Sequence, residues 1–177
     1  MNKGMLKKLG AFVGGDELIS IYTDTDDTDF FKLGYLIGLD KNNVMMNLID
    51  TFGQEDGFYL CSTNDIFIFD IDKMYSEKIK KLFDLKGQKR QHMSNLDSSP
   101  VVNLLKNAFD NHLLIEVNED TNYIGYINEF SEQFLVLELI DNYGNDMGMA
   151  NIDMRNVNIL ECQNRYLKDM ELLYGRK

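Results

Sequence analysis

Hydrophobic positions follow two periods along this chain, and both periods recur in its two halves. Apolar residues spaced three and four apart predict short helices near 5–13 and 101–109, and a longer apolar stripe predicts helices over 75–83 and 166–174. Between these helices, apolar and polar residues alternate as they do in strands. Each half is therefore expected to hold five strands, at 18–22, 33–39, 44–50, around 59–61 and 66–69 in the first half, and at 113–117, 124–130, 135–141, around 150–152 and 157–160 in the second.

The two halves also match each other residue by residue. Residues 31–75 align without a gap with residues 122–166, at a shift of 91 positions, and nine of the 45 pairs are identical. The identities include Gly34 with Gly125, which predicts a bend inside the second strand, and the turn glycines Gly53 and Gly57 with their counterparts. An internal duplication follows. We predict a first unit over 1–83, a mobile linker over 84–97 and a second unit over 98–177.

Composition narrows the class of protein. The chain has 177 residues and a formal net charge of -11, and 44% of its residues are hydrophobic. An acidic protein of this kind is a poor partner for duplex DNA or an anionic membrane, because both need a basic footprint. No apolar run approaches the length of a membrane span, no signal-peptide pattern is present, and two cysteines make no disulfide framework. We therefore expect a cytoplasmic protein.

One segment of the first half resembles a known family. In Gly34-Tyr-Leu36-Ile-Gly38-Leu-Asp40, two glycines and an aspartate precede a hydrophobic strand, which is similar to the first motif of Sm-like small barrels. The resemblance implies a mainly β fold with flanking α-helices, arranged as two tandem five-stranded Sm-like barrels. Many family members form rings and bind single-stranded RNA through the loops after strands two and four. In this chain the corresponding residues are Asp40, Lys41, Asn42, Asn43, Ser62 and Asn64.

An asymmetry between the halves suggests a protein interface instead. One face of strands four and five carries Phe58, Leu60, Phe67 and Phe69 in the first half, where the second half has Met149, Asn151, Asn158 and Leu160. A large apolar face needs a cover, which is either the chain itself or another protein. A partly open barrel also leaves strand edges, so we expect self-association into a dimer or small ring.

Two charged segments have a functional and a structural interpretation. Four aspartates within 24–29 offer oxygen ligands for a hard cation such as calcium, but the spacing lacks the glycine and the glutamate of a calcium loop, and a solvated loop explains it equally. The segment 78–90 has five more basic than acidic residues. It is either a contact for phosphate or an acidic partner, or a solvated helix face.

Catalytic chemistry has little support in the sequence. His92, His112, Cys61 and Cys162 have no matching residue of their type in the other half, and no metal-binding, phosphate-binding or nucleophile motif is present. We therefore expect no enzyme activity, no cofactor and no metal. The leading hypothesis is a cytoplasmic protein-interaction or regulatory adaptor that self-associates. The alternative is an Sm-like protein that binds single-stranded RNA.

Overall fold

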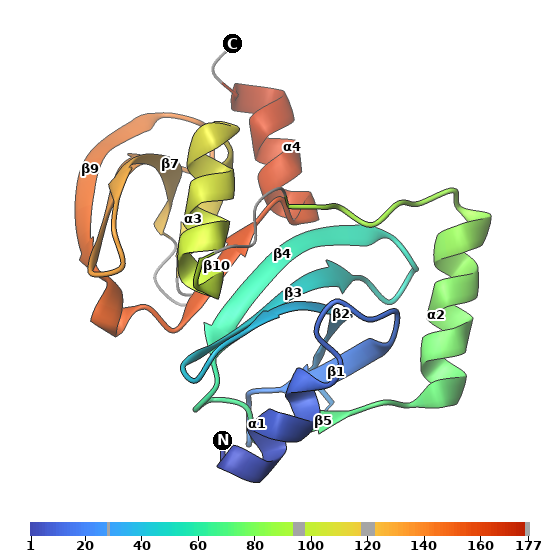
Figure 1. Ribbon diagram of the computed structural model, residues 1–177. Coiled ribbons are helices and arrows are strands. Elements are labelled where there is room, and N and C mark those ends of the chain that lie inside the picture. Colours follow the sequence, from blue (N-terminus) through green and yellow to red (C-terminus); the bar gives the residue numbers. More distant parts are fainter. Residues whose placement is uncertain (28, 94–97, 118–122, 176–177) are drawn as a thin grey trace. The chain divides into compact units, whose positions relative to one another are not determined.

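The computed structural model describes residues 1–27, 29–93, 98–117 and 123–175 (Figure 1). In this part of the chain the fold is mainly β, with ten antiparallel strands and four α-helices. The described residues form two compact units, Met1–Gly57 with Cys61–His92, and Phe58–Leu60 with the residues from Met93 onward. No helix among them is long and apolar enough to cross a membrane.

The first half places its strands in the order β5-β1-β2-β3-β4. Asn2 caps the first helix, because its side-chain oxygen accepts a hydrogen bond from the Met5 amide at 2.9 Å. Asp72 caps the second helix in the same way through the Tyr75 amide. The elements are α1 (Lys3–Gly10), β1 (Leu18–Tyr22), β2 (Lys32–Leu39), β3 (Asn43–Ile49), β4 (Glu55–Ser62), β5 (Ile68–Asp70) and α2 (Lys73–Leu85).

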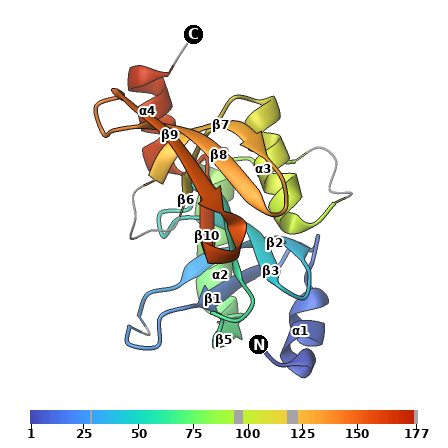
Figure 2. The same ribbon diagram turned by 90° about the vertical axis from the view of Figure 1, so that its left-hand side faces the viewer.

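The second half repeats this plan, with the strand order β10-β6-β7-β8-β9. β7, β8 and β9 lie side by side as a curved, three-stranded stretch (Figure 2). The elements are α3 (Pro100–Asp110), β6 (Leu114–Val117), β7 (Tyr123–Phe130), β8 (Phe134–Ile140), β9 (Asp146–Asp153), a 3-10 turn η1 (Met154–Asn156), β10 (Ile159–Cys162) and α4 (Arg165–Tyr174).

The helix that follows the five strands of each half, α2 or α4, packs on strands of its own half. In the first half, Ile79 and Phe83 of α2 join a buried cluster with Leu18, Leu33, Tyr35 and Ile49 from β1, β2 and β3. In the second half, Leu167 and Met170 of α4 join the cluster of Leu114, Ile124, Tyr126 and Ile140 from β6, β7 and β8. The stripe predicted for α2 is thus the face that this helix packs on the strands, with Ile79 and Phe83 buried. For α4 the prediction is only partly right. Met170 of the predicted stripe is buried, but Tyr166, Leu173 and Tyr174 are exposed at 43%, 68% and 40%.

Local geometry recurs at the 91-residue shift. A Cβ atom built on Gly34 would lie 2.3 Å from the carbonyl oxygen of Asn47, and one on Gly125 would lie 2.3 Å from that of Glu138. Because no side chain fits at that distance, glycine is required at both places. The turn glycines Gly53 and Gly144 have φ of 70° and 75°, in the left-handed region that glycine adopts without strain.

Barrel closure differs from the sequence-based prediction. The fold class is mainly β as expected, but two closed five-stranded barrels are not shown. In the described residues the two end strands of each half, β4 with β5 and β9 with β10, are not hydrogen-bonded to each other. β5 has three residues and β10 has four. Such short fifth strands add few ladder hydrogen bonds, and the strand order stays open.

Candidate functional site

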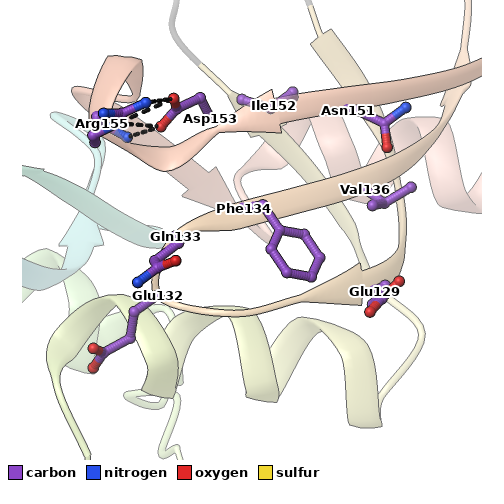
Figure 3. Close-up of a pocket in the computed structure, with 9 residues that line it drawn as sticks. All are labelled: Glu129, Glu132, Gln133, Phe134, Val136, Asn151, Ile152, Asp153 and Arg155. Atoms are coloured by element: carbon purple, nitrogen blue, oxygen red, sulfur yellow. Dashed lines mark hydrogen bonds and ion pairs between the residues drawn. The ribbon is translucent and has the colours of Figure 1, made fainter.

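A pocket of about 760 Å³ lies on the second half, on one face of β7, β8 and β9 (Figure 3). Strand register builds this face row by row. Val136 of β8 is paired with Glu129 of β7 on one side and with Asn151 of β9 on the other, and the next row pairs Phe134 with Asp153. We call this surface the pocket face; it is completed by Glu132, Gln133, Ile152 and Arg155.

The centre of the pocket face is the ring of Phe134, which points into the open space (Figure 3). The hairpin turn before β8 fixes this residue. The Phe134 amide donates to Ser131 Oγ at 3.2 Å, and its carbonyl accepts from the Ser131 amide at 2.8 Å. Although Phe134 is a large apolar side chain, 40% of it is exposed. An exposed ring held by a turn is a ready contact for a ligand.

Charge on the pocket face is negative. It carries the carboxylates of Glu129, Glu132 and Asp153 against the guanidinium of Arg155, a net charge of about -2 when each group has its ordinary charge. Arg155 is already engaged, because its Nε lies 3.0 Å from each carboxylate oxygen of Asp153. Hydrogen bonding to Arg155 lowers the pKa of the Asp153 carboxyl to about 2. This arrangement disfavours anions and favours a cation.

β9 borders the pocket face and is hydrogen-bonded, among the described residues, only to β8. Its first four residues are exposed, including Met147 at 62% and Met149 at 50%. Unpaired backbone groups along such an edge can accept another strand. Pocket and edge therefore form one continuous candidate site.

The loops predicted for RNA are brought together in the first half. The Thr63 amide donates to the Asn42 carbonyl at 2.7 Å, and Thr63 Oγ1 donates to the Lys41 carbonyl at 2.9 Å. Asp40 shapes the first loop, since its Oδ1 accepts from the amides of Asn42 and Asn43. In the second loop, Ser62 Oγ accepts from the Asn64 amide at 3.2 Å. The equivalent loops of the second half, where Met154 donates to Gln133, border the pocket.

The four residues predicted for a protein interface have two different environments. Phe58 and Leu60 are buried, at 2% and 1% exposure, so the chain itself covers them. Phe67 and Phe69 are half-buried. The Phe67 ring meets the Tyr22 ring edge-on, with centroids 6.3 Å apart. Both faces of β4 are buried, because Tyr59 and Cys61 on the alternate side are also fully inaccessible.

The end of the basic segment 78–90 overlaps a short stretch, residues 88–91, which we call the strap and which contacts other residues of the first unit. The Arg90 guanidinium lies 3.7 Å from the centre of the Tyr35 ring and 2.8 Å from Asp16. Gln88 Oε1 accepts from the Glu55 amide, and Gln91 Nε2 donates to Glu55 Oε2. These residues belong to the predicted mobile linker, and Gln88, Arg90 and Gln91 make these contacts with residues of the first half. Residues 94–97 of that linker lie outside the described residues.

The remaining candidates from the sequence are the acidic loop, the two cysteines and the two histidines. Asp24 and Asp27 accept backbone hydrogen bonds within their own loop, and residue 28 lies outside the described residues. In the described part of the chain no group of three or more histidine, cysteine or acidic side chains could hold a metal ion. Cys61 and Cys162 are both buried. His112 stacks on Tyr126 with centroids 4.4 Å apart, and His92 is exposed.

Comparison of this chain with protein-family models, with curated proteins and with solved structures found no match.

The central residues of the pocket were missed by sequence reasoning. Glu129, Glu132 and Phe134 are exposed residues around one hairpin turn, and nothing in a single strand distinguishes them. A signal was nevertheless present in the repeat. At the positions 91 residues earlier the chain has Gly38, Lys41 and Asn43, so the second half has gained two carboxylates and an aromatic ring.

Proposed function

We propose that this protein is a non-enzymatic protein-interaction module that binds an extended segment of a partner along β9. The observation that carries the proposal is the exposed edge of β9 beside the pocket face. Addition of a strand to a sheet edge is a common mode of peptide recognition, in which backbone hydrogen bonds supply affinity and side-chain pockets supply specificity.

The sequence of β9 supports this function. Proteins usually protect edge strands with lysine, proline or a covering element. β9 reads Asp-Met-Gly-Met-Ala-Asn-Ile-Asp, with neither lysine nor proline over its eight residues. Its two exposed methionines are flexible apolar side chains of the kind that adapt to varied partners. Charged residues stand only at the two ends of β9, Asp146 and Asp153, so the six residues between them form the binding surface in this proposal.

Net charge indicates the chemistry of the partner. The chain has a formal net charge of -11 and a pI near 4.6. Electrostatic steering accelerates encounter with partners of opposite charge and slows encounter with nucleic acid. The partner in this proposal is a basic segment of a cytoplasmic protein. Its positive charge is opposite to the negative charge of the whole chain and of the pocket face.

The experiment uses a defined probe. A nine-residue peptide, blocked at both ends, has serine, threonine and valine on either side of one central arginine. We expect it to shift the amide resonances of β9 in the full-length protein. Met149→Lys places a charge at the edge and should abolish the shifts, whereas Met74→Lys, at a residue 84% exposed on α2, should leave them unchanged. The proposal is overturned if the β9 resonances do not shift with this peptide or with versions that carry another residue in place of the central arginine.

Single-stranded RNA is the second candidate, and the hydrogen bonds that join the loops of Lys41, Asn42 and Thr63 favour it. Binding of this kind depends on phosphate contacts and weakens steeply with salt. A uridine oligonucleotide titrated at low salt tests it, with Lys41→Ala as the variant. Absence of binding at the lowest salt removes the RNA hypothesis.

A further inference from the structure

We propose that the pocket face of the second half captures the basic side chain, arginine or lysine, of the segment that adds to β9. This inference rests on the proposed function and specifies what the pocket recognises. It concerns Glu129, Glu132 and Phe134 as ligand-binding residues, none of which the sequence patterns single out.

Phe134 supplies the first element of recognition. The face of an aromatic ring attracts a cation within about 6 Å of its centre, and a planar guanidinium stacks on it especially well. The ring is 40% exposed at the middle of the pocket, and two hydrogen bonds with Ser131 fix its backbone. Little conformational freedom is lost at the backbone of Phe134 when a ligand binds.

Carboxylates supply the second element. Glu129 and Glu132 lie at different sides of the Phe134 ring in the pocket (Figure 3). Glu132 is oriented by Ser99, whose Oγ lies 3.3 Å from its Oε1. Val136 and Ile152, both half-buried, offer apolar surface for the methylene stem of a long basic side chain. Charge, ring and apolar lining thus match the three parts of an arginine or lysine.

Arg155 explains why a cation, rather than an anion, fits. Among the residues that line the pocket it is the one with a positive charge, and both Nε and Nη2 point at the Asp153 carboxylate. An incoming phosphate or carboxylate would have to compete with Asp153 for this guanidinium, close to two further carboxylates. An incoming cation meets Glu129 and Glu132 directly.

The first half provides an internal contrast. At the positions equivalent to Glu132 and Phe134 it has Lys41 and Asn43, so it offers a positive charge and no ring. The hydrogen bond between the two loops is nevertheless the same in both halves, from Thr63 to Asn42 at 2.7 Å and from Met154 to Gln133 at 3.0 Å. Local backbone geometry is kept while the chemistry of the side chains is reversed. Cation recognition belongs to the second half.

The test compares the nine-residue peptide with versions whose central arginine is replaced by lysine, norleucine or glutamate, using calorimetry on the full-length protein. We expect the arginine and lysine peptides to bind about tenfold more tightly than the norleucine peptide. The glutamate peptide should bind most weakly of the four. Glu129→Gln with Glu132→Gln should remove most of the preference, and Phe134→Leu should weaken arginine binding about three- to tenfold. Asp169→Asn with Glu77→Gln, which also removes two negative charges at exposed residues of α4 and α2, is the matched control.

A gain of affinity gives the sharpest outcome. Arg155→Gln removes the competing cation and frees Asp153, so the arginine peptide should bind more tightly to this variant than to the wild type. A phosphate-binding pocket would respond in the opposite direction.

Three outcomes separate the two proposals. Equal affinity for all central residues, with β9 resonances still shifting, overturns the pocket inference alone. Shifts of Phe134 with N-acetylarginine amide, and no β9 shift with any peptide, overturn the edge-binding function while supporting the pocket. No response to either probe overturns both.

Discussion

Arg155 and Asp153, two positions apart in the sequence, form an ion pair in which Arg155 Nε lies 3.0 Å from both carboxylate oxygens. Both side chains line the pocket, and the guanidinium is 87% exposed. The pair is too exposed to stabilise the fold appreciably, because water and salt screen it. Its consequence is electrostatic: it cancels one negative charge at the rim of a site that keeps two others.

The Asp153 carboxyl should titrate according to this pair. Hydrogen bonds from Arg155 lower the pKa of Asp153 from its ordinary value of 3.8 to about 2. The ion pair is therefore fully formed above the ordinary pKa of the carboxyl, and it is lost as the pH falls through about 2. Arg155→Gln should raise the pKa of Asp153 toward 3.8, as followed by the NMR shift of its carboxyl carbon. Asp141 serves as control, because hydrogen bonds from Asn145 lower its pKa in both proteins. An Asp153 pKa unchanged in the variant would show that the ion pair is absent in solution.

Glycine at position 34 should be indispensable. A Cβ there would stand 2.3 Å from the Asn47 carbonyl oxygen and 3.0 Å from two further backbone atoms of β3. Backbone cannot move aside as a flexible side chain does, so Gly34→Ala should destabilise the protein by about 3 kcal/mol, and Gly125→Ala similarly. Gly10→Ala is the control, since its new methyl group would meet only Leu39 at 3.5 Å. Urea unfolding measures all three, and equal midpoints for Gly34→Ala and Gly10→Ala would contradict the close approach.

The parts of the fold that sequence anticipated are those controlled by neighbours along the chain. Spacing within 75–83 identified the buried face of α2, and Ile79 and Phe83 lie in the core cluster of β1, β2 and β3. Glycine pairs at the 91-residue shift marked the two places where the backbone of the neighbouring strand comes too close for a side chain. These signals are local, because a helix stripe or a turn needs only residues close in sequence.

Contacts between distant segments could not be read in the same way. The strap joins Arg90 to Asp16, 74 residues away, and Gln91 to Glu55, 36 residues away. The pocket likewise arises only when strand register places Glu129, Val136 and Asn151 in one row. The alternation in β4 also left open what covers its apolar face. Phe58 and Leu60 needed a cover, and the chain itself provides it, since both faces of that strand are buried.

The strap should contribute measurably to the stability of the first unit. Arg90 is 23% exposed and lies over Tyr35, which itself is buried at 6% exposure. Loss of a partly desolvated cation–π contact costs about 1 kcal/mol, so Arg90→Ala should lower the free energy of unfolding by that amount and Arg90→Lys by less. Lys89→Ala, at an exposed neighbour, should have no effect. Hydrogen exchange should also become faster at the Glu55 amide, which donates to Gln88.

Phe69 should report on self-association. It lies in β5, a three-residue strand paired with β1 alone among the described residues, and it is half-buried. An unprotected edge with an apolar side chain beside it favours pairing with a second chain. If the protein forms a dimer or small ring through this edge, Phe69→Asp should yield the monomer mass by light scattering. Phe52→Asp, at a turn residue 64% exposed, should keep the wild-type mass.

Phe67→Asp is a less suitable variant, because Phe67 contacts Tyr22 and its loss should destabilise the fold as well. A wild type that is already monomeric, or a Phe69→Asp variant of unchanged mass, would contradict association through β5.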